Sequence, residues 1–415
     1  MTRGLRGLMH TGAGIAIAMA VMNLTMYGFT MVAARMLGPQ SYGAFAATMN
    51  VLLVVSVVSL GLQTTAARRI SADPQHVGQI QAQVLRVTLR ASLAVGALLI
   101  LLAPVINELL KLDNLLLAAL IGPVAVPLTM VGGQAGTLQG ERRWLPLGVL
   151  YIAAGVPRLL VGLAMMLWRP EELVAFLAVG IASLAPVLVG WVALRPVREP
   201  GATSATHQGR RIAKEALRNS QALFAFFALS NVDLIVARNV LSAHDSGLYG
   251  GGLILAKAML FLPQFVVVVA FPAMASAQER RRALARSLGL VTLLGVLGSL
   301  AAWLLSDLAL VFVGGQEYAE IKDQLWLFAL LGTTLSMLQL VVYAVIARQG
   351  QRSIYLVWAA LVAVVVGGLT VSTLTGLLLW VIVVDAALLA TLVAISFVAV
   401  SHDPAPSEDA APSTV

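Results

Sequence analysis

The chain has 415 residues, of which 59% are hydrophobic and only 11% are charged, against roughly 25% charged in soluble globular proteins. A soluble fold is excluded, because so few polar side chains cannot cover the apolar surface. The net charge of +8 sits in short stretches between apolar runs, where it sets membrane topology, so no nucleic-acid partner is expected. The absence of cysteine excludes disulfides, thiolate metal sites and cysteine nucleophiles.

Apolar runs recur from end to end of the chain, and about 20 such residues suffice for a helix to cross the hydrocarbon core. They lack the strict alternation of a β-barrel, so we expect helices. Arg3 and Arg6 precede the first run without a cleavage site, so that helix is expected to stay as an anchor. The fold class is an all-α integral membrane protein of about twelve transmembrane helices. In chain order the predicted spans are 13–35, 43–67, 84–107, 115–138, 145–168, 172–194, 217–241, 247–272, 287–305, 324–347, 354–375 and 376–400.

Basic residues are distributed unevenly between the two sides of these spans. Most of the 27 Lys and Arg residues lie at the N-terminus and in the even-numbered connections. The odd-numbered connections hold only Arg35, Lys111, Arg169, Arg238 and Lys322. By the positive-inside rule, both termini are predicted to be cytoplasmic, with the chain in a bacterial inner membrane.

The middle of the chain holds its longest polar connection. Residues 195–216 contain Pro, Gly, Ser and Thr and are predicted to form a cytoplasmic linker. This linker separates an N-terminal six-helix lobe, residues 1–194, from a C-terminal six-helix lobe, residues 217–400. The tail 401–415, rich in Pro, Ser, Asp and Ala, is predicted to be disordered.

An internal repeat supports this division. The segment VAARMLGPQSYGAF at 32–45 resembles IVARNVLSAHDSGLYG at 235–250, and in each a short loop leads from Ala-Arg to a Gly that opens the next span. Gln-Gly at 139–140 and at 349–350 gives a second match at a similar offset. Because the spans have the same parity in both halves, the lobes are predicted to be parallel repeats around an axis along the membrane normal.

Four ionisable residues lie deep inside predicted spans: Arg158, Asp233, Lys257 and Asp385. Each costs about 2.5–3.5 kcal/mol to insert at a helix centre, so each is expected to face protein or water rather than lipid. We interpret Arg158 and Lys257 as cations of a hydrated central cavity that attract an anionic substrate. Asp233 and Asp385 are candidates for ion coupling or for charge pairing, and a pair between Asp233 and Lys257 is the alternative to the cavity interpretation.

The other polar residues carry weaker expectations. Arg35 and Arg238, at the ends of spans, are expected to extend to the membrane interface. The five histidines lie near chain ends or in loops with no pair at ligand spacing on a helix, so no metal site is predicted. Gly250, Gly251 and Gly252 lack the Lys-Ser/Thr of a phosphate-binding loop, so neither ATP nor another cofactor is expected.

Four segments together resemble a known family: ARMLGPQSYGAF, SLGLQTTAARRIS, NVDLIVARNVLSAHDSGLYGGGLILAKAMLFLPQ and FVGGQEYAEIKDQLWLFALL. In their order and spacing, over most of residues 13–400, the chain resembles the polysaccharide transporter family. These are lipid-linked oligosaccharide flippases of the multidrug/oligosaccharidyl-lipid/polysaccharide exporter superfamily.

The resemblance implies two six-helix lobes around a central cavity that opens alternately to the two membrane faces. It implies that the substrate is an undecaprenyl-pyrophosphate-linked glycan or a related repeat unit, flipped from the inner to the outer leaflet. Membrane lipids and polysaccharide assembly proteins are the further partners it suggests. It also places Arg158, Asp233 and Lys257 where the family often has polar or charged residues.

Three other functions compete with this one. An ion-coupled multidrug or toxic-compound exporter of the same superfamily usually has an acidic residue in its first helix, and residues 11–35 contain none. A membrane glycosyltransferase, polymerase or ligase typically has a large outer loop or an acidic pair after the first span, where this chain has Pro39, Gln40 and Ser41. A scaffold or lipid scramblase is the third alternative. The sequence leaves the driving force open among protons, sodium and the membrane potential.

Overall fold

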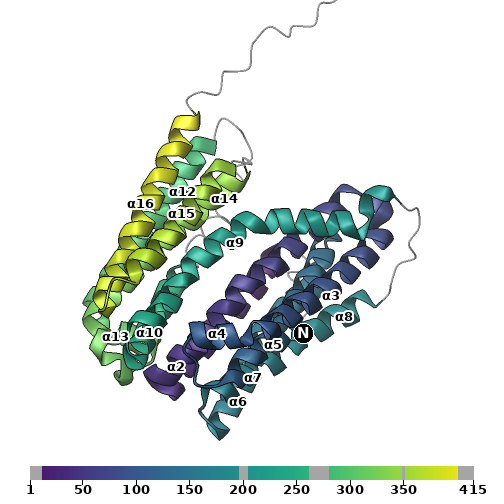
Figure 1. Cartoon of the computed structure of the whole chain (residues 1–415). Coiled ribbons are helices and arrows are strands. Elements are labelled where there is room, and N and C mark those ends of the chain that lie inside the picture. Colours follow the sequence, from purple (N-terminus) through teal and green to yellow (C-terminus); the bar gives the residue numbers. More distant parts are fainter. Residues whose placement is uncertain (1–11, 196–203, 261–279, 348–350, 401–415) are drawn as a thin grey trace, which may run out of the picture.

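The computed structural model describes residues 12–195, 204–260, 280–347 and 351–400, which form helices and short connections without any β-strand (Figure 1). The helices of the first half are α2 (Gly12–Ala72), η1 (Pro74–His76), α3 (Val77–Leu101), α4 (Ala103–Leu109), α5 (Leu115–Gly140), α6 (Trp144–Trp168), α7 (Glu172–Ala182) and α8 (Leu184–Leu194). Those of the second half are η2 (Ala205–His207), α9 (Gly209–Val240), α10 (Ala243–Met259), α12 (Arg280–Leu304), α13 (Ser306–Val313), η4 (Gln316–Gln324), α14 (Leu325–Ala347), α15 (Gln351–Gly368) and α16 (Leu374–Val400).

Helix α2 contains the first two predicted spans. Its backbone is non-helical at Gly38, where φ is 69° and ψ is 169°. A positive φ of this size favours glycine, since other residues would meet steric strain there. Pro39 follows at the start of the second segment, a position that tolerates proline because the first turn leaves its N–H groups unpaired. The kink therefore divides α2 into two membrane-crossing helices.

The predicted membrane architecture is confirmed. Among the described residues, nine helices are long and apolar enough to cross a membrane, and one of these is the kinked Gly14–Ala72. The eleventh predicted span appears as the shorter apolar helix Ile354–Gly368. The predicted span 247–272 runs beyond α10 into residues that lie outside the described ranges, as do the tail 401–415 and part of the predicted linker.

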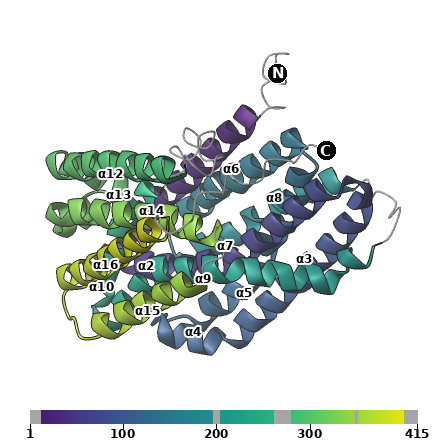
Figure 2. The same cartoon turned by 90° about the horizontal axis from the view of Figure 1, so that it is seen from above.

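The helices of the two halves follow the same order. Each half has a short helix after its third span, α4 in the first and α13 in the second, and their first residues, Ala103 and Ser306, lie 203 positions apart. This offset equals the one between the repeated sequence segments. The helices α12, α14, α15 and α16 group on one side and α3, α5, α6 and α8 on the other, with α2 and α9 between them (Figure 2). This is a two-lobed fold.

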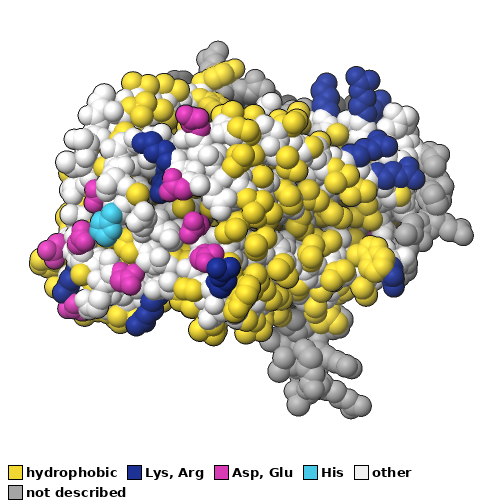
Figure 3. All heavy atoms as spheres, turned by 60° about the horizontal axis from the view of Figure 1, so that its bottom comes forward, with side chains coloured by type: hydrophobic (Ala, Val, Ile, Leu, Met, Phe, Trp, Pro, Cys, Tyr) yellow, Lys and Arg dark blue, Asp and Glu magenta, His cyan; other side chains and the backbone are white. Residues whose placement is uncertain are grey.

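The surface has the distribution of charge that a membrane protein requires. A broad band of hydrophobic side chains separates an end where acidic and basic residues mix from an end where Lys and Arg predominate in this view (Figure 3). Large apolar side chains in contact with the surroundings include Leu101, Leu167, Trp168, Trp303 and Leu304. In a soluble protein such a band would mark an interaction site, and here it fits contact with lipid tails.

Candidate functional site

Arg158, on α6, is the basic residue that the first lobe places in its interior. Its guanidinium lies 5.3 Å from the centroid of the Phe29 ring, a distance at which a cation is attracted by the aromatic face. Its Nη2 lies 3.3 Å from the sulfur of Met49. In the part of the chain that the structure describes, Arg158 forms no ion pair, and its Nε has no hydrogen-bond partner. The guanidinium therefore keeps donors available for an anion.

Arg158 lines a cavity of about 260 Å³ inside the first lobe. The polar groups around it are few and consist of serine hydroxyls and one phenol, whereas most of the wall is apolar. A cation in such a wall has little competing solvation, so its attraction for an anion is strengthened. The lining residues are Met22, Met26, Ser56, Ser59, Leu60, Leu128, Val131, Tyr151, Ala154, Arg158, Val179, Ser183 and Pro186.

A short polar network continues from this cavity along α2. The Gln63 side-chain amide donates to the Tyr151 hydroxyl oxygen at 3.0 Å and to Oε1 of Gln139 at 3.1 Å. Tyr151 belongs to the cavity lining, and Gln63 lies about one turn beyond Leu60 on α2. The network therefore extends from the cavity toward the end of α2 that carries Arg68 and Arg69.

Lys257, on α10, joins the two lobes in the membrane interior. Its ammonium donates a hydrogen bond to Oδ1 of Asn50, which lies on α2 and is 1% exposed. Asn50 follows Met49, the residue that contacts Arg158. The two predicted cations thus contact neighbouring residues of one helix, Arg158 from the first lobe and Lys257 from the second. Arg158 lines the cavity, whereas Lys257, also predicted as a cavity cation, is not among the residues that line it.

The alternative pairing of Asp233 with Lys257 does not form a salt bridge in the structure. Asp233, on α9, instead accepts a hydrogen bond from the Tyr249 hydroxyl at 3.2 Å and one from the backbone N–H of Leu234 at 2.8 Å. Lys257 still acts on Asp233 electrostatically from a greater distance. Tyr249 was not singled out by the sequence, because its role depends on the packing of α10 against α9.

Asp385, on α16, is the most isolated of the four predicted residues. Its side chain is 1% exposed, and neither carboxylate oxygen has a hydrogen-bond partner among the described residues. Asp385 interacts electrostatically with Asp233, the other buried carboxylate of the second lobe. A buried carboxylate without partners is costly, so this pair is a place where a proton or a small cation would be favourable.

The lobes are in close contact where the two repeated segments end, and we call this region, which includes Gly43, Arg238 and Gly247, the closed end. A Cβ added to Gly43 would come within 2.9 Å of the Gly247 Cα, and one added to Gly247 would meet the Pro39 carbonyl group. Each glycine opens the second span of its half. Corresponding residues of a parallel repeat meet at the axis that relates the halves, so this contact lies near that axis.

Arg238 contradicts the expectation that it extends to the membrane interface. It is 6% exposed, and its Nε donates to the Leu110 carbonyl oxygen at 2.8 Å, while Nη2 donates to that of Lys111. These carbonyls follow α4, where a helix end leaves acceptors unpaired and negatively polarised. Lys111 donates in return to the Asn239 carbonyl oxygen at 2.8 Å. The sequence did not predict this exchange of hydrogen bonds, because it depends on the contact between α4 and the end of α9. Arg35, the other arginine at the end of a span, is exposed.

The opposite end, which includes Arg68, Arg69 and His207, is called the basic end. Here the first turns of α9 lie across the first lobe (Figure 1). Glu215 of α9 accepts hydrogen bonds from Arg68 and Arg69 at the end of α2. Nearby, Asp73 accepts hydrogen bonds from His207 and His76, which lower the pKa of its carboxyl group to about 2. The carboxylate is therefore ionised at any physiological pH.

The fold is that of a helical membrane protein with charged residues between its helices, and comparisons with known proteins give its class. The polysaccharide biosynthesis protein family matches residues 11–278. The chain belongs to this family, and it is a membrane transporter of the MOP superfamily. No curated protein matches the chain in sequence.

Solved structures of MATE transporters share the fold. An inward-facing multidrug resistance MATE transporter of the MOP superfamily superposes with a TM-score of 0.69 at 13% identity, over 93% of this chain and 98% of that one. A eukaryotic MATE transporter gives 0.68 at 13% identity, over 92% and 94%. An outward-facing MATE transporter gives 0.57 at 14% identity, over 97% and 98%. The two-lobed prediction is confirmed, and the arrangement is more similar to the inward-facing structure than to the outward-facing one.

Proposed function

We propose that this protein flips a polyprenyl-pyrophosphate-linked oligosaccharide or polysaccharide repeat unit from the inner to the outer leaflet by alternating access. The observation that carries the proposal is the position of Arg158 and Lys257. Both contact the stretch Met49–Asn50 of α2 from opposite lobes, and neither forms an ion pair with a described carboxylate. Two cations without carboxylate partners suit the two phosphates of a pyrophosphate group. The lipid tail would remain in the bilayer.

The proposed orientation places the basic end in the cytoplasm. Lys and Arg predominate at that end of the hydrophobic band, as the positive-inside rule requires (Figure 3). The contacts at the closed end then lie on the outer face, so the conformation faces inward. The similarity to an inward-facing MATE structure supports this assignment. Loading of the substrate head from the cytoplasm would be followed by separation of the lobes at the closed end.

Asp385 and Asp233 are proposed to couple the cycle to an ion. Asp385 is buried without a hydrogen-bond partner among the described residues, and a cation or proton would relieve its desolvation. An ion-coupled exporter of cationic drugs is the second candidate, and these carboxylates together with the MATE-like fold are the observations that favour it. Arg158 argues against that candidate, because a positive charge in the cavity wall repels a cationic drug.

The test is genetic and biochemical. In cells whose own flippase gene is deleted, lipid-linked repeat units should accumulate in the inner leaflet, and the wild-type protein should restore surface glycan. Arg158→Ala and Lys257→Ala should each reduce restoration about tenfold or more at normal protein levels, since a charged hydrogen bond contributes about 1.5–3 kcal/mol. Arg169→Ala is the matched control, because Arg169 directly follows α6 and is exposed. Full rescue by both Arg158→Ala and Lys257→Ala would exclude the cation mechanism.

A further inference from the structure

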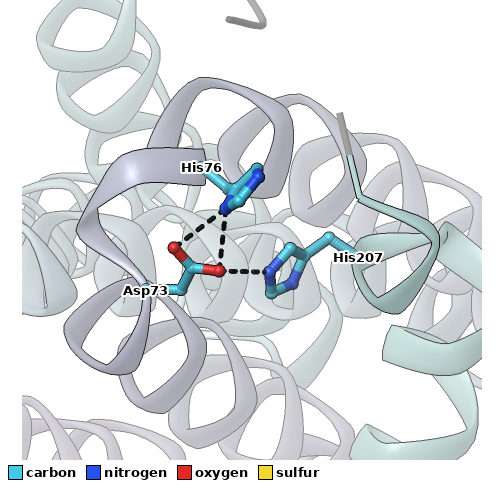
Figure 4. Close-up of side chains that lie close together, drawn as sticks. All are labelled: Asp73, His76 and His207. Atoms are coloured by element: carbon cyan, nitrogen blue, oxygen red, sulfur yellow. Dashed lines mark hydrogen bonds and ion pairs between the residues drawn. The ribbon is translucent and has the colours of Figure 1, made fainter. Parts of the chain in front are cut away.

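Three side chains that are distant in sequence meet at the basic end (Figure 4). Asp73 and His76 lie at the junction of α2 and α3, and His207 ends η2. Nδ1 of His76 lies 2.8 Å from Oδ2 of Asp73, and Nε2 of His207 lies 2.9 Å from the same oxygen. One potential ligand atom from each residue lies within 4.8 Å of the other two. This cluster is separate from the cavity and from the buried charges described above.

The backbone around the cluster is fixed by other contacts. The side-chain amide of Gln79 donates to the Ser204 carbonyl oxygen at 2.9 Å and accepts from the Ser204 N–H at 2.8 Å. Nη1 of Arg69 donates to the Thr206 carbonyl oxygen at 2.8 Å. Residues 204–207 are therefore held against the first lobe even without the histidines. His207 itself is 7% exposed, so its ring has few alternative orientations.

We propose that Asp73, His76 and His207 bind a divalent transition-metal ion such as Zn²⁺. Two imidazole nitrogens and one carboxylate oxygen are ligands that this ion prefers, and three protein ligands leave a fourth position for water. Zinc bonds of about 2.0–2.1 Å in tetrahedral geometry place ligand atoms roughly 3.3 Å apart. The two separations between a ring nitrogen and the carboxylate oxygen, 2.8 and 2.9 Å, would have to widen by about half an ångström. The two ring nitrogens, which lie within 4.8 Å of each other, would have to take up the same spacing. The ion would replace the two protons that now bridge the histidines to the carboxylate.

The charges around the cluster are compatible with a bound cation. Nη1 of Arg69 lies 3.4 Å from Nδ1 of His207. If Nε2 of His207 bound the metal, Nδ1 would carry the ring proton and could no longer accept a hydrogen bond from Arg69, so this contact would weaken. Arg69 keeps its stronger partners, Glu215 and the Thr206 carbonyl oxygen. The nearest guanidinium is therefore held by Glu215, which it shares with Arg68, and by the Thr206 carbonyl oxygen, and does not depend on the histidine.

The site would act on the connection between the lobes. His207 lies two residues before Gly209, where α9 begins, and α9 then crosses from the first lobe to the second (Figure 1). An ion that joins η2 to the start of α3 would hold the first turns of α9 on the first lobe. The proposal goes beyond the transport function and stands independently of the substrate.

The test uses the full-length protein without an affinity tag, purified in detergent and stripped of metal by a chelator. Isothermal titration with Zn²⁺ should show one ion per chain, and the ion should raise the thermal unfolding temperature. His207→Ala and His76→Ala should each weaken binding about 100-fold or more, because each removes one of three ligands. His244→Ala is the matched control, since His244 pairs with Glu320 at 3.0 Å on an exposed surface and contributes nothing to the cluster.

Two results would overturn the proposal. One is the absence of zinc binding to the wild-type chain, which would leave a hydrogen-bonded cluster without a metal. The other is binding that His207→Ala and His76→Ala leave as strong as in the wild type, which would place the ion elsewhere. Circular dichroism and gel filtration of each variant show whether lost binding reflects lost folding. Because His76 is partly exposed to solvent, His76→Ala should disturb the fold least.

Discussion

The closed end and the basic end join the two lobes in different ways. At the closed end, glycines bring backbones into contact, and Arg238 satisfies carbonyl groups of the other lobe in a buried position. At the basic end, among the elements that the structure describes, α9 and η2 of the second half reach the first lobe, and the charged contacts are those of Arg68 and Arg69 with Glu215 and of Asp73 with His207. Glycine also brings the lobes together near this end, since a Cβ added to Gly61 would meet the Ala216 carbonyl oxygen. Arg68 is 65% exposed. The comparison teaches that opening the closed end must separate closely packed backbones and a buried arginine, whereas at the basic end the lobes are joined by charged side chains, of which Arg68 is exposed and screened by water.

The largest expected effect comes from separating the backbones at the closed end. Gly247→Val would place a Cβ against the Pro39 carbonyl group, which cannot move aside as a flexible side chain would. Overpacking costs typically about 1–3 kcal/mol and more where backbone must shift, so we expect the lobes to separate there and flipping to stop.

The measurement for Gly247→Val is the distance between spin labels on cysteines introduced at Glu171 and Glu320, since the chain has no cysteine of its own. The distance should increase relative to the parent protein. Gly289→Val is the control, because a Cβ at Gly289 meets nothing within 4 Å. An unchanged distance in Gly247→Val would contradict the assignment of this end as closed.

A smaller effect is expected from removing the buried arginine contact. Arg238→Gln would leave the carbonyl groups of Leu110 and Lys111 without charged donors. Hydrogen bonds to a charged group contribute about 1.5–3 kcal/mol, so we expect a lower unfolding temperature and a larger outward-open population by the same spin-label distance. Arg35→Gln, at an exposed residue, should change neither. Equal effects of the two substitutions would show that the carbonyl contacts are unimportant.

Between the two ends, the bridge of Lys257 to Asn50 should show coupling of intermediate size. Asn50→Ala and Lys257→Ala each remove one partner of the hydrogen bond between the lobes. In a double-mutant cycle, the interaction free energy should be about 1 kcal/mol, because each substitution removes the same hydrogen bond between buried Asn50 and partly buried Lys257. Unfolding in detergent measures it. Strict additivity of the two substitutions would indicate that the bridge does not contribute to stability.

The smallest effect is expected at the basic end. Glu215→Gln removes the charge that pairs with Arg68 and Arg69 but keeps one acceptor oxygen, so the free energy of unfolding should fall by about 0.5–1.5 kcal/mol. Glu215 and Arg69 are only 11% and 15% exposed, whereas Arg68 is 65% exposed, so only the part contributed by Arg68 should shrink as salt is raised. Glu171→Gln, which breaks an exposed pair with Arg169, should have a still smaller effect. A loss as large as that of Arg238→Gln would remove the contrast between the ends.

The sequence predicted those features that depend on one segment at a time. Apolar runs locate membrane helices because each helix forms its backbone hydrogen bonds within itself and must be long and apolar enough to cross the hydrocarbon core. The charge of Arg158 in such a run indicated that it faces the interior, and the structure places it in a cavity wall. The repeat at residues 32–45 and 235–250 also predicted the two lobes, because a repeated segment folds in the same way twice.

Features that need two distant segments were missed for a physical reason. The role of Arg238 depends on the unpaired carbonyls at the end of α4, a helix too short to stand out in hydropathy. Tyr249 became a partner of Asp233 only through packing of α10 on α9. His76 and His207 are 131 positions apart, so a search for ligand spacing along one helix cannot find them. The repeat alone does not identify the contact of Gly43 with Gly247, since only corresponding residues that lie near the axis meet.

Translocation by the purified protein tests the central claim most directly. A polyprenyl-pyrophosphate-linked oligosaccharide with a fluorescent sugar is placed in proteoliposomes, and a membrane-impermeant quencher reports its leaflet over time. The account predicts that the wild type and Arg169→Ala exchange the lipid between leaflets, whereas the double variant Arg158→Ala, Lys257→Ala is at least about tenfold slower. Two results would contradict this account. One is exchange of the lipid by the double variant at the wild-type rate, and the other is a wild-type protein that moves a cationic dye but leaves the lipid-linked glycan in place.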